Sequence, residues 1–148
     1  MTTTVRQILQ KKNIQKIITV SPEQSILEAL GLMAEKDISA VLVTEGERLV
    51  GIFTERDYAR KVVLKGRTSK DTKVGELMTQ NLLTVSPSHT VDDVMQIMTD
   101  NRFRHLPVVE KGVLMGIVTI GDAVKTVIDQ QAETIKALSG YISGEMSI

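Results

Sequence analysis

The sequence predicts an α+β fold: two tandem β-α-β-β-α repeats, related by a pseudo-two-fold axis, with their small sheets packed face to face. The first observation is a duplication, because Thr19-Val20-Ser21-Pro22 recurs 65 residues later as Thr84-Val85-Ser86-Pro87. The second is that Gly51–Asp57 recurs at the same separation as Gly116–Asp122. The third is size, since a repeat of about sixty residues buries only ~60% of its surface alone and gains stability by packing on its copy.

Each repeat is expected to begin with a short apolar strand, over Ile17–Val20 and Leu82–Val85. Both strands end at a Ser-Pro turn, because proline interrupts strand pairing. A helix follows Ser25 in the first repeat and Thr90 in the second. Each of these hydroxyl residues stands three positions before a carboxylate, which is the pattern of a capping box.

The remaining elements also occur in matching pairs. We expect the helices to end near Asp37 and Arg102, each followed by a strand, a turn rich in Glu, Gly and Lys, and a second strand. A closing helix then begins at an aspartate. The expected strands are Ala40–Thr44 and Leu49–Thr54, then Leu106–Val109 and Leu114–Thr119; the expected closing helices are Asp57–Leu64 and Asp122–Leu138.

These elements divide the chain into three parts. Residues 1–71 are expected to form the first repeat with its N-terminal segment and linker, residues 72–129 the second repeat, and residues 130–148 a C-terminal helical extension. An apolar stripe at helical spacing runs along the last helix, where we expect it to cover the edge of the module or meet another subunit. The stripe consists of Val124, Val127, Ile128, Ile135, Leu138 and Ile142.

Composition excludes several classes of protein. Eighteen basic and eighteen acidic side chains give a net charge of zero, which argues against a nucleic-acid binder. The absence of cysteine excludes disulfides, thiolate metal sites and thiol nucleophiles, and two histidines are too few for a histidine-rich metal cage. No apolar run approaches the ~20 residues of a membrane helix, and the first ten residues do not resemble a signal peptide. We therefore expect a cytoplasmic protein that binds neither nucleic acid nor membrane.

Two Thr-x-x-Asp motifs are candidate binding residues. Thr54 with Asp57, and Thr119 with Asp122, stand at matching strand-to-helix turns after Gly-Ile. An aspartate there can accept hydrogen bonds from the vicinal hydroxyls of a ribose. The alternative is that each aspartate only caps its helix, which contributes about 1 kcal/mol. The duplication of the motif favours a site.

The segment Arg102-Phe103-Arg104-His105-Leu106-Pro107 is the second candidate. Arginine can bind phosphate oxygens bidentately and histidine can add a donor. A solvated helix end that places cations near the dipole's negative pole explains the same residues equally well. The matching place in the first repeat, Asp37-Ile38-Ser39-Ala40, carries no comparable positive charge.

With these motifs in order and in tandem, the sequence resembles a pair of CBS domains, often called a Bateman module. The resemblance covers about Val5–Asp71 and Lys73–Asp129, and Thr54–Lys61 is similar to the corresponding run of small stand-alone bacterial members. It implies a non-catalytic regulatory module, acting as an energy or metabolite sensor in signal transduction. It also implies homodimers, an effector protein of unknown identity and no catalytic cofactor.

The resemblance further implies two composite clefts for an adenosyl ligand, with AMP placed first and ADP, ATP, NAD or S-adenosylmethionine as alternatives. Because Gly121 and Ser39 occupy the places of Arg56 and Arg104, we expect the first cleft to bind phosphate more tightly. Cleft one would combine Thr54, Arg56, Asp57, Gln80, Phe103, Arg104 and His105; cleft two would combine Gln15, Ile38, Ser39, Ala40, Thr119, Ile120 and Asp122.

An enzyme and a ligand-independent interaction module are the two other classes of function that the sequence allows. An enzyme is disfavoured because the usual phosphate-loop, zinc-protease and serine-hydrolase motifs are absent and no positioned base accompanies the two aspartates. A ligand-independent dimerisation or docking module remains the alternative, with the stripe along the last helix as its interface. The basic stretch Arg56–Lys73 is a weaker hint of nucleic-acid binding, since such runs are more often solvated faces.

Overall fold

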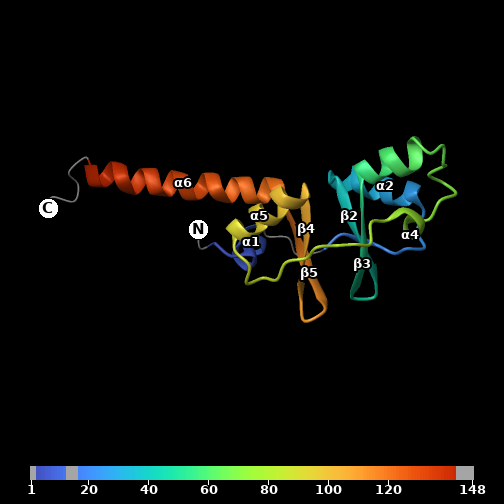
Figure 1. Cartoon of the computed structure of the whole chain (residues 1–148), viewed down its shortest axis with the longest axis horizontal. Helices are drawn as coiled ribbons and strands as arrows, with labels where there is room; N and C mark the ends of the chain where they lie inside the picture. The colour runs from blue at the N-terminus through green and yellow to red at the C-terminus, as the bar shows by residue number, and fades with distance from the viewer. Residues whose placement is uncertain (1–2, 13–16, 143–148) are drawn as a thin grey trace.

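The computed structural model describes residues 3–12 and 17–142, and it has two halves whose strands meet in the middle with helices outside them (Figure 1). The sheet of the first half has the order β1-β2-β3, in which β1 is parallel to β2 and β2 is antiparallel to β3. Its strands are β1 (Thr19–Val20), β2 (Ala40–Glu45) and β3 (Arg48–Thr54). The predicted first strand, Ile17–Val20, is therefore shorter than expected.

The second half repeats this arrangement with β4 (His105–Glu110) antiparallel to β5 (Val113–Thr119). The prediction of a strand over Leu82–Val85 was wrong, because only Val85 pairs there, in an isolated parallel bridge to Val108. The two sheets pack together through a cluster in which Ala40, Leu42 and Ile52 of the first half lie against side chains of the second. The partly buried members of this cluster are Ile17, Leu49, Leu82, Leu114 and Ile117.

Helices α2 (Ile26–Lys36) and α5 (Val91–Asn101) begin where the sequence predicts. The Ser25 hydroxyl accepts a hydrogen bond from the Glu28 N–H, and Thr90 forms a full capping box with Asp93. The helices end at Asp37 and Arg102, the predicted residues, both in the left-handed conformation. The duplication therefore extends to the caps.

The closing helices begin two residues earlier than expected. Thr54 is the N-cap of α3 (Glu55–Asp57), and Asp57 is the N3 member of its capping box, so the prediction that the aspartate opens the helix was wrong. The π-helical turn η1 (Tyr58–Val63) continues α3. In the second half α6 (Ile120–Ile142) extends past the predicted end at Leu138 and projects away from the rest of the molecule (Figure 1).

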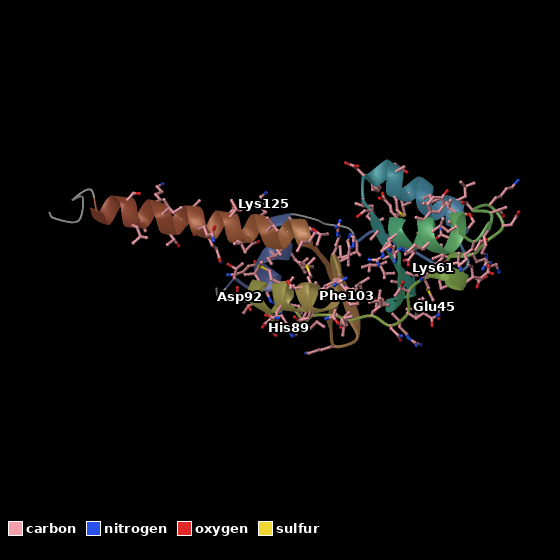
Figure 2. All side chains as sticks on the ribbon, turned by 45° about the horizontal axis from the view of Figure 1, so that its top comes forward. Glu45, Lys61, His89, Asp92, Phe103 and Lys125 are labelled. Carbon is pink, nitrogen blue, oxygen red and sulfur yellow. The ribbon has the colours of Figure 1, made fainter. Side chains whose placement is uncertain are left out.

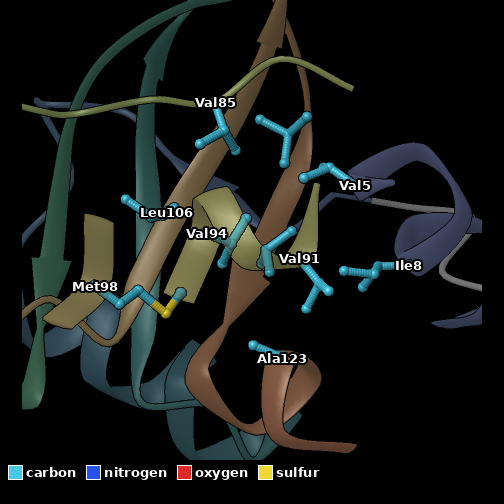
Figure 3. Packing of buried hydrophobic residues seen from close by; sticks show 10 residues of the cluster. Val5, Ile8, Val85, Val91, Val94, Met98, Leu106 and Ala123 are labelled. Carbon is cyan, nitrogen blue, oxygen red and sulfur yellow. The ribbon is translucent and has the colours of Figure 1, made fainter. Parts of the chain in front are cut away.

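The helix that precedes each repeat packs on the other repeat. Helix α1 (Val5–Lys12) was not predicted; its Val5 N–H donates to the His89 carbonyl at 2.8 Å. Its residues Val5 and Ile8 enter the core of the second half with Val85, Val91, Val94, Met98, Leu106 and Ala123 (Figure 3).

Reciprocally, α4 (Val74–Leu77) precedes the second repeat and packs on the first. The Val74 N–H donates to the Gln24 carbonyl at 2.8 Å, and Val74 joins the core around Phe53. The two repeats are thus joined by an exchange of helices as well as by their sheets.

Two glycines permit this exchange. A Cβ on Gly51 in β3 would lie 2.6 Å from the Met78 Sδ, and a Cβ on Gly116 in β5 would lie 3.0 Å from a methyl of Leu9. These matching positions allow the exchanged segments to approach the strands closely. Among the described helices, none is both long enough and apolar enough to cross a bilayer.

Candidate ligand-binding clefts

The first cleft lies between the end of β3 and the segments that lead into β4, and its volume is about 700 Å³. Six of the seven residues predicted for it line it, although Thr54 and Asp57 come from one repeat and Phe103 from the other. Phe103 is labelled near the middle of the molecule in Figure 2. The six residues are Thr54, Arg56, Asp57, Phe103, Arg104 and His105.

Asp57 is the acceptor at the base of this cleft, and it is only 8% exposed. Its Oδ2 accepts a hydrogen bond from the Thr54 N–H at 3.0 Å and lies 3.1 Å from the Thr54 Oγ1. Its Oδ1 accepts from the Thr79 hydroxyl at 3.1 Å and forms an ion pair with Lys61 at 3.0 Å. A buried carboxylate needs such partners. Two of them are hydroxyls, which can rotate to admit another donor.

The rim of this cleft is cationic. Arg56 and Arg104 project from the two repeats, and the lining also contains Arg60 and Arg102, which the sequence analysis did not assign to it. Glu55 and Asp57 are its acidic residues. The arrangement places guanidinium groups opposite a carboxylate acceptor, as a sugar phosphate requires.

Gln80 is exposed and does not line the cleft, whereas its neighbours Thr79 and Asn81 do. The reason is local pairing: the Thr79 N–H and carbonyl pair with Ile52, which turns the side chain of Thr79 toward Asp57. The alignment of the two repeats could not tell which of the neighbours Thr79, Gln80 and Asn81 lines the cleft.

The second cleft has a volume of about 420 Å³ and is mostly apolar. The predicted residues that line it are Ile38, Ser39, Ala40, Thr119 and Ile120. Gln15 lies outside the described residues. Leu9 and Lys12 of α1 also line this cleft. Neither residue was predicted to line the cleft, because the sequence there gives no clear helical pattern.

Asp122 is held by the capping-box bond from the Thr119 N–H at 2.9 Å, but it does not line the cleft. The Lys12 Nζ lies 2.7 Å from the Asp122 Oδ2 and donates to the Ile117 carbonyl at 2.9 Å. The second cleft therefore carries positive charge, although its segment Asp37-Ile38-Ser39-Ala40 supplies none. Lys12 supplies a cation from α1, while Arg104 and His105 line both clefts.

His105 links the two clefts. Its Nε2 lies 3.1 Å from the Ser39 hydroxyl across the boundary between the repeats, and Ser39 lines both clefts. Burial, with the nearby charges of Arg104 and Lys12, lowers the pKa of His105 from its ordinary value of 6.5. Near neutral pH the neutral imidazole is therefore the favoured form when no anion is bound.

In the described part of the chain, no group of three or more histidine, aspartate or glutamate side chains is placed to hold a metal ion. The composition contains no cysteine.

A family model described as CBS domain matches residues 3–64 and 74–129. The CBS domain-containing protein CBSX3, mitochondrial, of Arabidopsis thaliana is 42% identical over 127 residues, which are 82% of this chain and 62% of that protein. YhcV of Bacillus subtilis is 37% identical over 107 residues, which are 72% of this chain and 76% of that protein. The chain spans about a quarter of several longer Arabidopsis relatives, among them CBSCBSPB1 at 26%.

Solved structures of proteins with CBS domains have a similar fold. A protein with CBS domains from Burkholderia ambifaria superposes with a TM-score of 0.83 at 50% identity, over 87% of this chain and 96% of that one. CBSX2, crystallised in complex with AMP, has a TM-score of 0.71 at 28% identity, over 87% of this chain and 98% of that one.

Proposed function

The chain belongs to the CBS-domain family, with two repeats in tandem, and from that premise we propose that it is a non-catalytic sensor that binds an adenosyl ligand in its first cleft. The observation that carries this proposal is the position of Asp57. Its carboxylate lines a cleft whose opposite side carries Arg104 and His105 from the other repeat. The acceptor suits a ribose diol and the cations suit a phosphate.

AMP is the first candidate among the adenosyl ligands. CBSX2, which resembles this chain in fold, was crystallised with AMP, and the arginines at the rim suit the AMP phosphate. ATP, ADP, NAD and S-adenosylmethionine share the adenosyl half and stay as alternatives. The signal would be a population shift, because a ligand that contacts both repeats favours one angle between them over others. A cytoplasmic location and an effector protein belong to the same proposal.

Calorimetric titration of nucleotide-stripped protein tests this function. AMP should bind, and Asp57→Asn should weaken it about tenfold or more, because hydrogen bonds to a charged acceptor contribute roughly 1.5–3 kcal/mol. The 2′,3′-dideoxy analogue of AMP, which lacks both hydroxyls, should bind the wild type and Asp57→Asn with nearly equal, weak affinity. Asp93→Asn is the matched control, since it removes the same capping carboxylate from α5, outside both clefts. No binding of any adenosyl ligand at millimolar concentration would refute the proposal.

The exposed face of α6 favours a second function, dimerisation with another copy of the chain. Ile128, Ile135 and Leu138 of α6 are 58%, 63% and 55% exposed. Helix α6 itself projects beyond the module (Figure 1). Spacings of seven and three residues place these three side chains on one stripe, which a second α6 could cover. Ile135→Asp should convert a dimer into a monomer in sedimentation equilibrium. Leu64→Asp, at an apolar residue that is 75% exposed elsewhere, should not.

A further inference from the structure

The two clefts differ in which member of an aspartate–lysine ion pair lines them. Asp57 lines the first cleft, whereas its partner Lys61 does not. In the second cleft the order is reversed, since Lys12 lines the cleft and Asp122 lies behind it. A ligand that enters the first cleft meets a carboxylate, and one that enters the second meets an ammonium group.

The two aspartates also differ in the described donors that hold them. The Ile52 carbonyl accepts from the Thr79 N–H, and the Thr79 hydroxyl donates to Asp57. In the second half the Lys12 Nζ lies 2.9 Å from the matching Ile117 carbonyl, to which it donates, and 2.7 Å from the Asp122 Oδ2.

The Lys12 ion pair changes how easily Asp122 can be reached. A hydroxyl turns away at small cost when another donor arrives, but an ion pair shielded from solvent does not. The side chains of Lys12 and Asp122 are only 17% and 19% exposed. Ribose hydroxyls would have to displace the ammonium group and leave it without its counter-ion.

We infer that Lys12 is a specificity-determining residue that closes the second cleft to the ribose diol, so that the chain binds one adenosyl ligand rather than two. The inference rests on the proposed function and extends it to the stoichiometry of binding. It also means that α1, which precedes the first repeat, controls the cleft formed by the Thr-x-x-Asp motif of the second.

The test counts AMP sites by equilibrium dialysis. The wild type should bind one AMP per chain, with any second site roughly 100-fold or more weaker, as expected when ligand binding must break a shielded ion pair. Lys12→Met keeps the length of the side chain and removes its charge, and it should bind two. Adding Asp122→Asn to Lys12→Met should return the count to one. Lys11→Met, a charge removal at the exposed neighbour on α1, should leave the count at one.

Two controls keep this test decisive. The count is repeated with adenosine, because Arg104 lines both clefts and two phosphates would compete for it. Lys12→Gln is a second variant, and its melting curve checks that α1 stays docked.

Each outcome separates the inference from the proposed function. Two sites in the wild type, or no gain in either Lys12 variant, would overturn the inference while a first site still stood. A site gained only on removing the Lys12 charge, with none in the wild type, would support the inference and refute binding in the first cleft. No site in any variant would refute both.

Discussion

Replacing Arg104 by alanine separates phosphate recognition from recognition of the nucleoside. Arg104 lies at the entrance to β4, and within the described residues its guanidinium has no hydrogen-bond or ion-pair partner, so it is available to a ligand. A hydrogen bond between charged groups contributes about 1.5–3 kcal/mol. Because Arg104 is exposed, the lower part of that range applies, about 1.5–2 kcal/mol, which corresponds to roughly 10–30-fold in Kd.

Calorimetric titration with AMP and adenosine measures this effect. Arg104→Ala should weaken AMP by that factor and change adenosine by less than about twofold, since adenosine has no phosphate. Arg48→Ala, an equal change in net charge at an exposed residue outside both clefts, should alter neither affinity. Equal losses for AMP and adenosine would refute the assignment of Arg104 to the phosphate.

Three further predictions concern stability. The pKa of His105 is lower in the folded chain than its ordinary value of 6.5, so below pH 6.5 the unfolded chain binds more protons than the folded one. The free energy of unfolding should therefore fall as the pH drops below 6.5. Urea titrations at pH 7.5 and 5.5 should show a smaller fall for His105→Gln than for the wild type. Gly75→Ala should lower the free energy of unfolding by about 1–3 kcal/mol, because the new Cβ would lie 2.9 Å from the Pro22 Cβ. Gly31→Ala, which adds a Cβ in open space on α2, should raise it by about 0.5–1 kcal/mol. Equal melting temperatures for the two variants would contradict the contact with Pro22. Phe53→Ala should cost about 3–5 kcal/mol by urea denaturation, because Phe53 is fully buried, and a loss below 1 kcal/mol would show that the core had repacked.

The duplication accounts for most of what the sequence predicts correctly. Because the pattern occurs twice, each copy supported the interpretation of the other. Ser25 and Thr90 were identified as helix caps, and Thr54, Asp57 and Thr119 as residues that line the clefts. Local hydrogen bonds satisfy these residues, and local sequence therefore reveals them.

The errors involve contacts between residues that are distant in the chain. Helix α1 is short and gains its stability from the core of the second repeat, so its own sequence gives little sign of it. Lys12 and Asp122 are 110 positions apart, and no spacing rule connects them. The segment at Leu82–Val85 has strand-forming residues, but apart from the Val85 bridge its described backbone makes no ladder.

The exchange of leading helices also orders the events of protein synthesis. The core around Phe53 can close as soon as Val74 has left the ribosome, because every member of that cluster has then been made. Helix α1 is made earlier but must wait for Leu106 and Val118, about a hundred residues later, which is roughly 5–20 s at about 5–20 residues per second. A helix of this length does not persist alone in water. During that interval the nascent chain carries a first repeat whose sheet face is still uncovered and an unfolded leading segment, which is the form that chaperones and proteases would encounter.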